Sequence, residues 1–381
     1  MRKPTSKQLT CLALSLLMAL GTAPAVYAAE GDTETAAKET TKTTLQELSE
    51  SLTSISYAAY KEQHADAKRG TKSVTITATD YIADQTTATV SVESNYNGKS
   101  GNSLVMQDDG KVTWKVNIPE TGLYSISIDY TSTSEKTNSI ERMLYLNDKV
   151  PFSEARYLLM KKTWVNDYID GRFEIDSNGN ELRPNSHVEH IWSTYDFIDS
   201  NGYYANPFEF YLEAGENTIT LEAVREPMAI QTITIHPYED KPAYEDYIAG
   251  KSEANASPIH LDAETPSATS DYTVYPIYDR KSAITEPQHH TRIMLNTIGG
   301  EKWQKVGQWV EYTFQVETAG LYEIVTRFRQ NELSGMYVSR KIFLDGEVPF
   351  EEANYAKFNY STDWQVEALN NGADTFQFYL E

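Results

Sequence analysis

The stretch RMLYLNDKVPFSEARY, from Arg142 to Tyr157, returns as RKIFLDGEVPFEEANY from Arg340 to Tyr355, with 8 of 16 positions identical. Upstream, the GLY at 122–124 matches the GLY at 320–322 at the same spacing of 198 residues. Further along, FEFYLE at 208–213 is matched by FQFYLE at 376–381. Similarity over this length predicts one domain used twice rather than a short repeated motif.

The two copies differ at two places. The first continues through AGENTITLEAVREPMAIQTITIH at 214–236, which alternates apolar and polar residues as half-buried strands do. No counterpart follows Glu381, so we expect the sequence to be the front of a longer protein; the alternative is a second unit that lacks its final strands. The first copy also holds roughly thirty extra residues near 166–201, an insertion length that is uncommon without a role or local disorder.

The amino terminus has the pattern of a secretory signal peptide over residues 1–28. Basic residues come first, an apolar run follows from Leu9 to Leu20, and small residues end at Ala28. A membrane-spanning helix is the alternative, but it needs about 20 continuous apolar residues. The only cysteine, Cys11, lies in this segment, so the exported chain would have neither a disulfide nor thiol chemistry. We therefore expect a secreted protein.

The remaining sequence divides into four parts. Residues 29–72 read as a flexible spacer with a possible short helix between Leu45 and Lys61, because large apolar residues are nearly absent before Ser56. Residues 73–238 and 259–381 read as two tandem β-sandwiches, joined by a polar linker with one short helix at 239–258. Many short strands separated by turn residues favour an all-β, jelly-roll architecture. A formal charge of −22 disfavours nucleic acid as a partner.

Sugar recognition by a sandwich uses flat aromatic rings flanked by polar side chains, carried on loops of a rigid scaffold. These are the candidate ligand-binding residues of the first copy: Tyr96, Asn97, Trp164, Arg183, Trp192 and Tyr195. These are the candidates of the second copy: Trp303, Trp309, Tyr360 and Trp364. For each aromatic residue, the alternative is ordinary core packing.

Metal and catalytic sites have weaker support. His187 and His190 could share a helical face and bind a metal, but the segment is loop-like and has no third ligand nearby. Neighbouring His289 and His290 would point to opposite faces of a strand. No recognised catalytic motif is present, so we expect a non-enzyme, although a pair of glycosidase carboxylates stays possible because their spacing is three-dimensional.

Two charged positions also coincide between the copies. Arg142 matches Arg340, and Glu154 matches Glu352. Since the other shared positions are mainly apolar, this coincidence predicts one structural ion pair within each sandwich.

Two segments resemble secreted carbohydrate-binding modules with a galactose-binding-like jelly roll. They are SVESNYNGKSGNSLVMQDDGKVTWKVNIPETGLYSISIDY at 91–130 and AGENTITLEAVREPMAIQTITI at 214–235. The resemblance implies a non-catalytic sandwich, in which a glutamate after alanine and an aspartate in the last strand hold structural calcium. The second copy has Ala263-Glu264, whereas the first has Ala78-Thr79 and carries Gln231 near the place of the aspartate.

A closer resemblance covers almost the whole mature chain. The segments SYAAYKEQHADAKRG (56–70), VREPMAIQTITI (224–235), TVYPIYDRKSAITEPQHHTRIMLNTIGGEKWQKVGQW (273–309) and KFNYSTDWQV (357–366) look like the front half of large extracellular solute-binding proteins of ABC sugar importers in Gram-positive bacteria. That family implies a cell-surface location and an ABC permease as partner through a further two-lobed domain. The two-lobed domain and the lipid-anchor cysteine of the family are missing here.

Three functions follow as hypotheses. The first is a secreted, non-catalytic protein that binds carbohydrate for an ABC importer. The second is a purely structural or cell-surface interaction module. The third is an accessory region of a glycoside hydrolase or lyase.

Overall fold

The computed structural model describes residues 54–381 and confirms the all-β prediction. The expected signal peptide and most of the expected spacer lie outside the described residues. Every pairing between named strands is antiparallel, as the jelly-roll prediction requires. Between residues 54 and 381, no helix is both long enough and apolar enough to cross a membrane.

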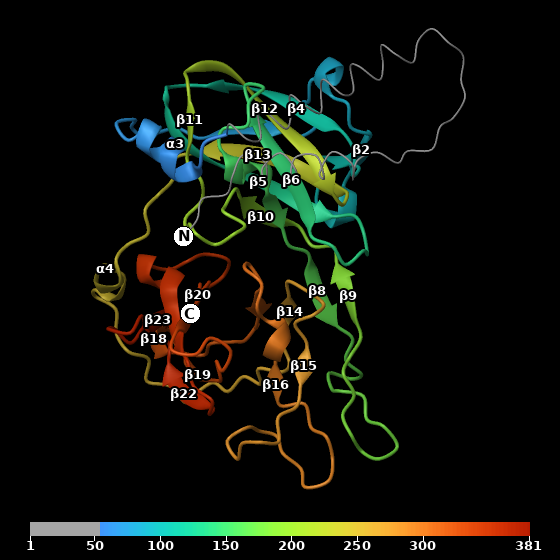
Figure 1. Cartoon of the computed structure of the whole chain (residues 1–381), viewed down its shortest axis with the longest axis vertical. Helices are drawn as coiled ribbons and strands as arrows, with labels where there is room; N and C mark the ends of the chain where they lie inside the picture. The colour runs from blue at the N-terminus through green and yellow to red at the C-terminus, as the bar shows by residue number, and fades with distance from the viewer. Residues whose placement is uncertain (1–53) are drawn as a thin grey trace, which may run out of the picture. The chain divides into compact units, whose positions relative to one another are not determined.

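The first sandwich has two sheets (Figure 1). One sheet comprises β1 (Val74–Thr77), β2 (Val90–Ser94), β3 (Asn102–Met106), β5 (Gly122–Ser132), β10 (Ser193–Asp196), β11 (Phe210–Leu212) and β13 (Met228–His236). The other comprises β4 (Lys111–Ile118), β12 (Gly215–Arg225), β6 (Ile140–Leu146) and β7 (Leu158–Met160).

Strand alternation places the core between these sheets. In β6, every second side chain is buried, beginning with Ile140 and ending with Leu146. Side chains from both sheets, such as Ile128 and Ile233 from one and Trp114 and Leu221 from the other, form one buried cluster. This rigid core fixes the positions of the loops and strand edges that carry the candidate site.

Helix α3 (Tyr57–Gln63) is part of the first sandwich, although the sequence places this stretch in a spacer. Tyr57 and Tyr60 are buried in the core, and their hydroxyls accept hydrogen bonds from the backbone N–H groups of Glu209 and Tyr211 at 2.9 and 2.7 Å. The two tyrosines therefore satisfy backbone donors of β11 and its flank, which is why the helix docks there.

The strands of the second unit are short, and most of them form separate two-stranded ladders rather than two full sheets. They are β14 (Ala268–Thr269), β15 (Pro276–Ile277), β16 (Thr297–Ile298), β17 (Val310–Glu311), β18 (Gly320–Glu323), β19 (Val325–Phe328), β20 (Tyr337–Arg340), β21 (Ala356–Asn359), β22 (Gln365–Ala368) and β23 (Gln377–Leu380). Helix α4 (Tyr244–Ile248) lies in the expected linker, and the hydroxyls of Tyr244 and Tyr247 accept from the N–H groups of Gln377 and Tyr379. Among the described residues, no strand of this unit corresponds to β12 or β13.

The expected ion pairs do not form. Arg142 donates to the backbone oxygens of Glu141, Arg225 and Glu226, each at 2.9 Å. Glu154 instead accepts from the N–H of Tyr57, at the start of α3. A carboxylate is favourable at a helix N-terminus because the first N–H groups there have no partner within the helix.

The predicted ion pair is also absent from the second copy, where the glutamate again binds the start of a helix. Glu352 accepts from the N–H of Tyr244 at 2.8 Å, at the start of α4. Arg340 donates to the backbone oxygen of Ser339 and lies over the ring of Trp303. The duplicated glutamates therefore bind helices, not the duplicated arginines.

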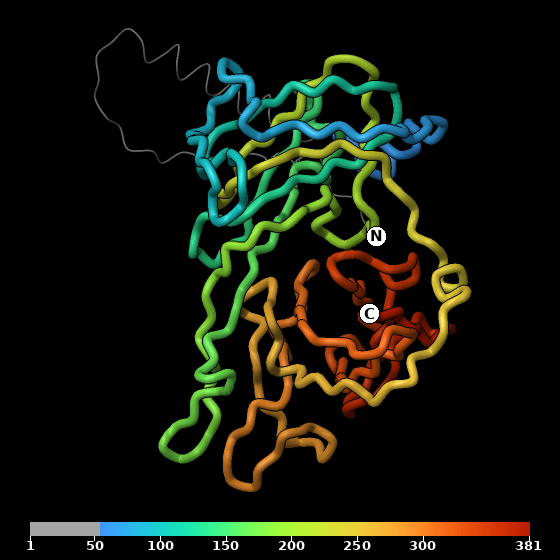
Figure 2. Tube along the Cα trace, turned by 180° about the vertical axis from the view of Figure 1, so that it is seen from behind, coloured from blue at the N-terminus to red at the C-terminus, as the bar shows by residue number. Residues whose placement is uncertain are grey.

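The insertion forms an extended arm, residues 163–189, which is the long green hairpin in Figure 2. Its strands are β8 (Thr163–Asn166) and β9 (Ser186–Glu189), and β8 also pairs with β14 of the second unit. The sequence places the insertion near 166–201, but β10 and the following residues belong to the repeated frame, because β22 pairs with β19 as β10 pairs with β5.

Candidate functional site

The first sandwich carries an aromatic patch beside β10. Trp192 directly precedes this strand, and its indole Nε1–H donates to the backbone oxygen of Tyr96 at 3.1 Å. The two rings meet edge to face, with centroids 6.5 Å apart. Lys99 Nζ lies over the Trp192 ring, 4.8 Å from its centroid, a distance at which the cation is attracted to the ring.

Asp129 of β5 provides the acidic part of this patch. Its carboxylate accepts from Lys99 Nζ at 2.9 Å and from the hydroxyls of Thr194 and Thr232 at 2.7 and 3.1 Å. Burial opposes its ionisation, but the hydrogen bonds from Lys99 and Thr194 outweigh that effect and lower the pKa of Asp129. The side chains of Lys99 and Asp129 are 30% and 28% exposed, so this charged pair is open to a ligand.

The loop that holds Tyr96 is a tight turn. Asn95 and Asn97 adopt φ values of 52° and 47°, in the left-handed region that asparagine enters more readily than most other residues with a side chain. Asn97 is exposed, and its side-chain amide makes no hydrogen bond with any part of the chain that the structure describes. We call Tyr96, Asn97, Lys99, Asp129, Trp192 and Thr194 the Trp192 patch.

The other candidates of the first copy lie elsewhere. Trp164 is buried in β8 and packs against Tyr272, with ring centroids 5.5 Å apart. The guanidinium of Arg183 lies 3.2 Å from the ring centroid of Tyr275. The hydroxyl of Tyr195 is buried, which raises its pKa, and its ring packs against the core. Trp164 and Tyr195 are therefore packed side chains, whereas Arg183 is exposed and also donates to the backbone oxygen of Tyr272 at 3.1 Å.

Three of the four candidates in the second unit are dispersed. Trp303 Nε1 donates to the backbone oxygen of Gln308 at 3.4 Å. The backbone of Trp309 pairs with Ser270 beside β14, and the backbone N–H of Tyr360 donates to Met336. Within residues 54–381, no contact joins these three side chains, so they do not form one site there.

Trp364 is the exception in the second unit. Its Nε1–H donates to Asp279 Oδ2 at 3.0 Å, and the same oxygen lies 3.0 Å from Arg329 Nη1. The guanidinium of Arg329 lies over the Trp364 ring, 5.2 Å from the centroid. A tryptophan, a cation and a carboxylate therefore meet here, as they do in the Trp192 patch.

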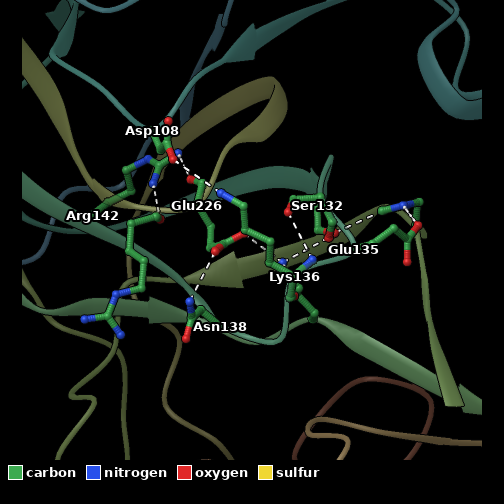
Figure 3. Close-up of polar contacts among 11 residues, drawn as sticks. Asp108, Ser132, Glu135, Lys136, Asn138, Arg142 and Glu226 are labelled. Atoms are coloured by element: carbon green, nitrogen blue, oxygen red, sulfur yellow. Dashed lines mark hydrogen bonds and ion pairs between the residues drawn. The ribbon is translucent and has the colours of Figure 1, made fainter.

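A buried polar cluster closes one end of the first sandwich (Figure 3). Lys162 and Glu226 form an ion pair at 3.2 Å, with side chains only 1% and 2% exposed. Lys162 Nζ also donates to the backbone oxygens of Ser134 and Lys136, so each of its three protons has a partner. Because the charges are enclosed and satisfied, this cluster holds loops together and offers nothing to a substrate.

No metal site is supported within residues 54–381, where no group of three or more His, Cys, Asp or Glu side chains could hold an ion. His187 binds Asp167 and Glu189, while His190 binds Ser132 and Glu135. In the first copy, the residues do not fit the calcium that the module resemblance implies, because Gln231 donates to the backbone oxygen of Ser100 and Thr79 follows Ala78. In the second copy, Glu264 is buried near Asp262 and Glu181, but the described residues hold no group of three or more such side chains that could bind an ion.

Sequence reasoning found Tyr96, Asn97, Trp192 and Trp364 but missed the charged residues around them. Lys99 follows Asn97 closely in the sequence and was a detectable candidate on loop position alone. Asp129 and Asp279 gave no signal, because 55 acidic residues offer too many choices without three-dimensional contacts.

Comparison with known proteins gives structural similarity only. No protein-family model matches the chain, and no curated protein sequence matches it. Solved structures similar to 43–45% of the chain include a GH26-CBM35 β-(1,4)-mannanase from Podospora anserina (17% identity, TM-score 0.27, 29% of that chain covered). They also include the C-terminal CBM6 of LamC from Zobellia galactanivorans (14%, 0.26, 99% covered).

A third similar structure is a family 35 carbohydrate-binding module from Clostridium thermocellum, at 16% identity and a TM-score of 0.24, with 44% of this chain and 99% of that chain covered. Thus the chain spans under a third of the mannanase but nearly all of each isolated module. At such identities and TM-scores, neither ligand nor activity transfers to this chain, and its function is inferred from its own Trp192 patch.

Proposed function

We propose that this protein is a non-catalytic, carbohydrate-associated protein whose Trp192 patch contacts a saccharide. One observation carries the proposal: the fold brings Trp192, which is far away in sequence, to the loop that holds Tyr96, Asn97 and Lys99, on a partly exposed surface with Asp129. Trp164 and Arg183 also meet, through Tyr272 and Tyr275, but no ion pair joins that group among the described residues.

The chemistry of the patch suits a sugar. The rings of Tyr96 and Trp192 offer apolar surface for the C–H groups of a pyranose. The amide of Asn97 both donates and accepts hydrogen bonds, while Lys99 donates and Asp129 accepts. A sugar hydroxyl needs both kinds of partner, and here they are supplied by side chains fixed to strands and a short constrained loop.

For the whole protein, we propose the front part of an extracellular solute-binding component of an ABC carbohydrate importer, secreted to a Gram-positive cell surface. The segments at 56–70, 273–309 and 357–366 support this through their family resemblance. An accessory region of a glycoside hydrolase is the second candidate. The mannanase from Podospora anserina and the laminarinase LamC, in which such modules accompany glycan-degrading enzymes, favour it.

Isothermal titration calorimetry of the full chain tests the site. The probes are neutral oligosaccharides of mannan, xylan and β-glucan, and the variants are Asn97→Ala and Lys99→Met. We expect at least one probe to bind the wild-type chain. Asn97→Ala removes the amide and strains the left-handed backbone at this position, and Lys99→Met removes the cation, so each variant should bind that probe about fivefold to tenfold more weakly. Asn201→Ala, which changes an exposed asparagine outside the patch, is the matched control.

A purely structural role predicts a different result. In that case, none of the neutral probes binds, or Asn97→Ala and Lys99→Met bind as the wild-type chain does. Circular dichroism of each variant separates loss of a contact from loss of folding. Release of reducing sugar from any probe by the purified chain would contradict the non-catalytic assignment.

A further inference from the structure

Trp192 and Trp364 occupy the same position in the two repeated units. In the first unit, Ser193 pairs with Tyr130; in the second, Gln365 pairs with Phe328. Since Tyr130 and Phe328 are 198 residues apart, at the spacing of the repeat, the two ladders are in the same register. Each tryptophan directly precedes the outer strand of its ladder.

Contacts beyond the ladders support this equivalence. Phe197 N–H donates to Ile126 at 2.9 Å, and Leu369 N–H donates to Ile324 at 2.9 Å. Phe208 and Phe376 then donate to Phe197 and Leu369, both at 2.8 Å. The arm has no counterpart in the second copy, so residues that follow it are fewer than 198 positions from their equivalents. An alignment at the fixed spacing of 198 residues therefore does not match Trp192 with Trp364.

Each tryptophan has a cation and a carboxylate beside it. The element that supplies the cation in the first unit corresponds to the one that supplies the carboxylate in the second, and the reverse also holds. In the first unit, the loop between β2 and β3 supplies the cation Lys99, and strand β5 supplies the carboxylate Asp129. In the second unit, the loop between β15 and β16 supplies the carboxylate Asp279, and the segment after β19 supplies the cation Arg329. The hairpin loops differ greatly in length, yet the same three chemical groups meet.

This difference in the supporting elements changes the charge that faces a ligand beside Trp364. Asp279 is only 8% exposed, and its oxygens already accept from Trp364 and from the backbone N–H of Lys281. Arg327 stands at the register position of Asp129, and Arg329 follows just after the end of β19; their side chains are 38% and 26% exposed. The ligand-facing charge is therefore positive in the second unit.

We propose that Asp279, Arg327, Arg329 and Trp364, here called the Trp364 patch, bind a saccharide that carries a carboxylate, such as a uronate. This inference rests on the proposed carbohydrate-associated function of the protein and adds a second site of different specificity. Among the described residues, Asp279 is the only ion-pair partner of Arg329, and Nη1 is the atom that makes this contact. The only ion-pair partner of Arg327 there is exposed Glu286, at 3.9 Å. Two guanidinium groups with unfilled donors suit a planar carboxylate, which they can bind with paired hydrogen bonds.

Calorimetry with oligosaccharides of polygalacturonate, alginate and hyaluronan tests this proposal on the full chain. We expect at least one to bind, with affinity that falls as sodium chloride is raised, because the contact is between opposite charges. Arg329→Met and Arg327→Met should each weaken binding about tenfold or more, as loss of a charge-assisted hydrogen bond does. Lys302→Met, which removes an exposed cation of the same unit, should leave binding unchanged.

The two patches can fail separately. If none of the three acidic probes binds, or if Arg329→Met and Lys302→Met lose affinity equally, the Trp364 patch is not a carboxylate site. If neutral oligosaccharides still bind in an Asn97-dependent way, the proposed function stands despite that failure. If Arg329→Met abolishes binding of the acidic oligosaccharides while Asn97→Ala leaves the affinity for the neutral oligosaccharides unchanged, the Trp364 patch stands and the Trp192 patch is contradicted.

Discussion

At the scale of single residues, Glu264 gives a prediction about pH. This carboxyl is 5% exposed, and burial raises its pKa to about 7, with Asp262 and Glu181 adding like-charge repulsion. The folded chain therefore keeps a proton that the unfolded chain releases near pH 4.5. Stability from this group is full below that pH and is lost as pH rises through about 7.

Replacing this carboxyl by an uncharged isostere should remove the loss of stability at high pH. We expect Glu264→Gln to raise the free energy of unfolding by about 1–3 kcal/mol at pH 8 and to change it little at pH 4.5. Urea denaturation at both pH values measures this. Glu317→Gln, at an exposed position, is the control, and an equal effect of Glu264→Gln at both pH values would show that its carboxyl is not the cause.

The residues of the Trp192 patch show what sequence can give at this scale. Tyr96, Asn97 and Trp192 were identifiable because aromatic and amide side chains near turns are typical of sugar sites. Their grouping was not, since Trp192 reaches Tyr96 through one indole hydrogen bond across the fold. The same residue types gave Trp164, which is buried in β8, and Tyr195, whose ring packs against the core, because composition does not reveal which side of a strand faces solvent.

At the scale of elements, each helix is fixed to its unit by two tyrosine hydroxyls. Tyr57→Phe removes the acceptor for the N–H of Glu209, and Tyr244→Phe removes that for Gln377. Leaving a part-buried donor without a partner should lower the free energy of unfolding by about 1–3 kcal/mol in each case.

Chemical denaturation of each variant measures this loss, and Tyr203→Phe at an 83% exposed position provides the comparison. If Tyr57→Phe and Tyr203→Phe have the same stability, the hydroxyl contacts do not hold the helix. A partial effect in only one unit would show that the two helices, although built alike, contribute differently.

Long strands were the most predictable elements. β12 and β13 follow the alternation at 214–236, because one face of each meets the core. Helix α3 was placed in a spacer, since its attachment depends on two tyrosines whose partners lie about 150 residues later. The Tyr-x-x-Tyr motif at 57–60 and 244–247 was a signal for it, but its spacing differs from that of the main repeat.

At the scale of the whole molecule, the arm joins the two repeated units through strand pairing. Thr269 of β14 pairs with Trp164 of β8, the N–H of Glu181 donates to Ile293 at 3.0 Å, and Arg183 lies over Tyr275. The buried core of the second unit is small, consisting mainly of Phe350, Phe376 and Phe378 with a few neighbours. These contacts should therefore supply much of its stability.

Replacing residues 163–191 by Ser-Thr-Asp, the sequence at 361–363 that precedes Trp364, tests this dependence. The exchange keeps Lys162 with its partner Glu226, and it keeps the pairing of β10 with β5, so the first sandwich should remain folded. Differential scanning calorimetry should show a transition for the second unit at lower temperature, separated from an almost unchanged transition of the first. If both units still unfold together at the wild-type temperature, the arm does not couple them, and the second unit is stable through its own core despite its small size.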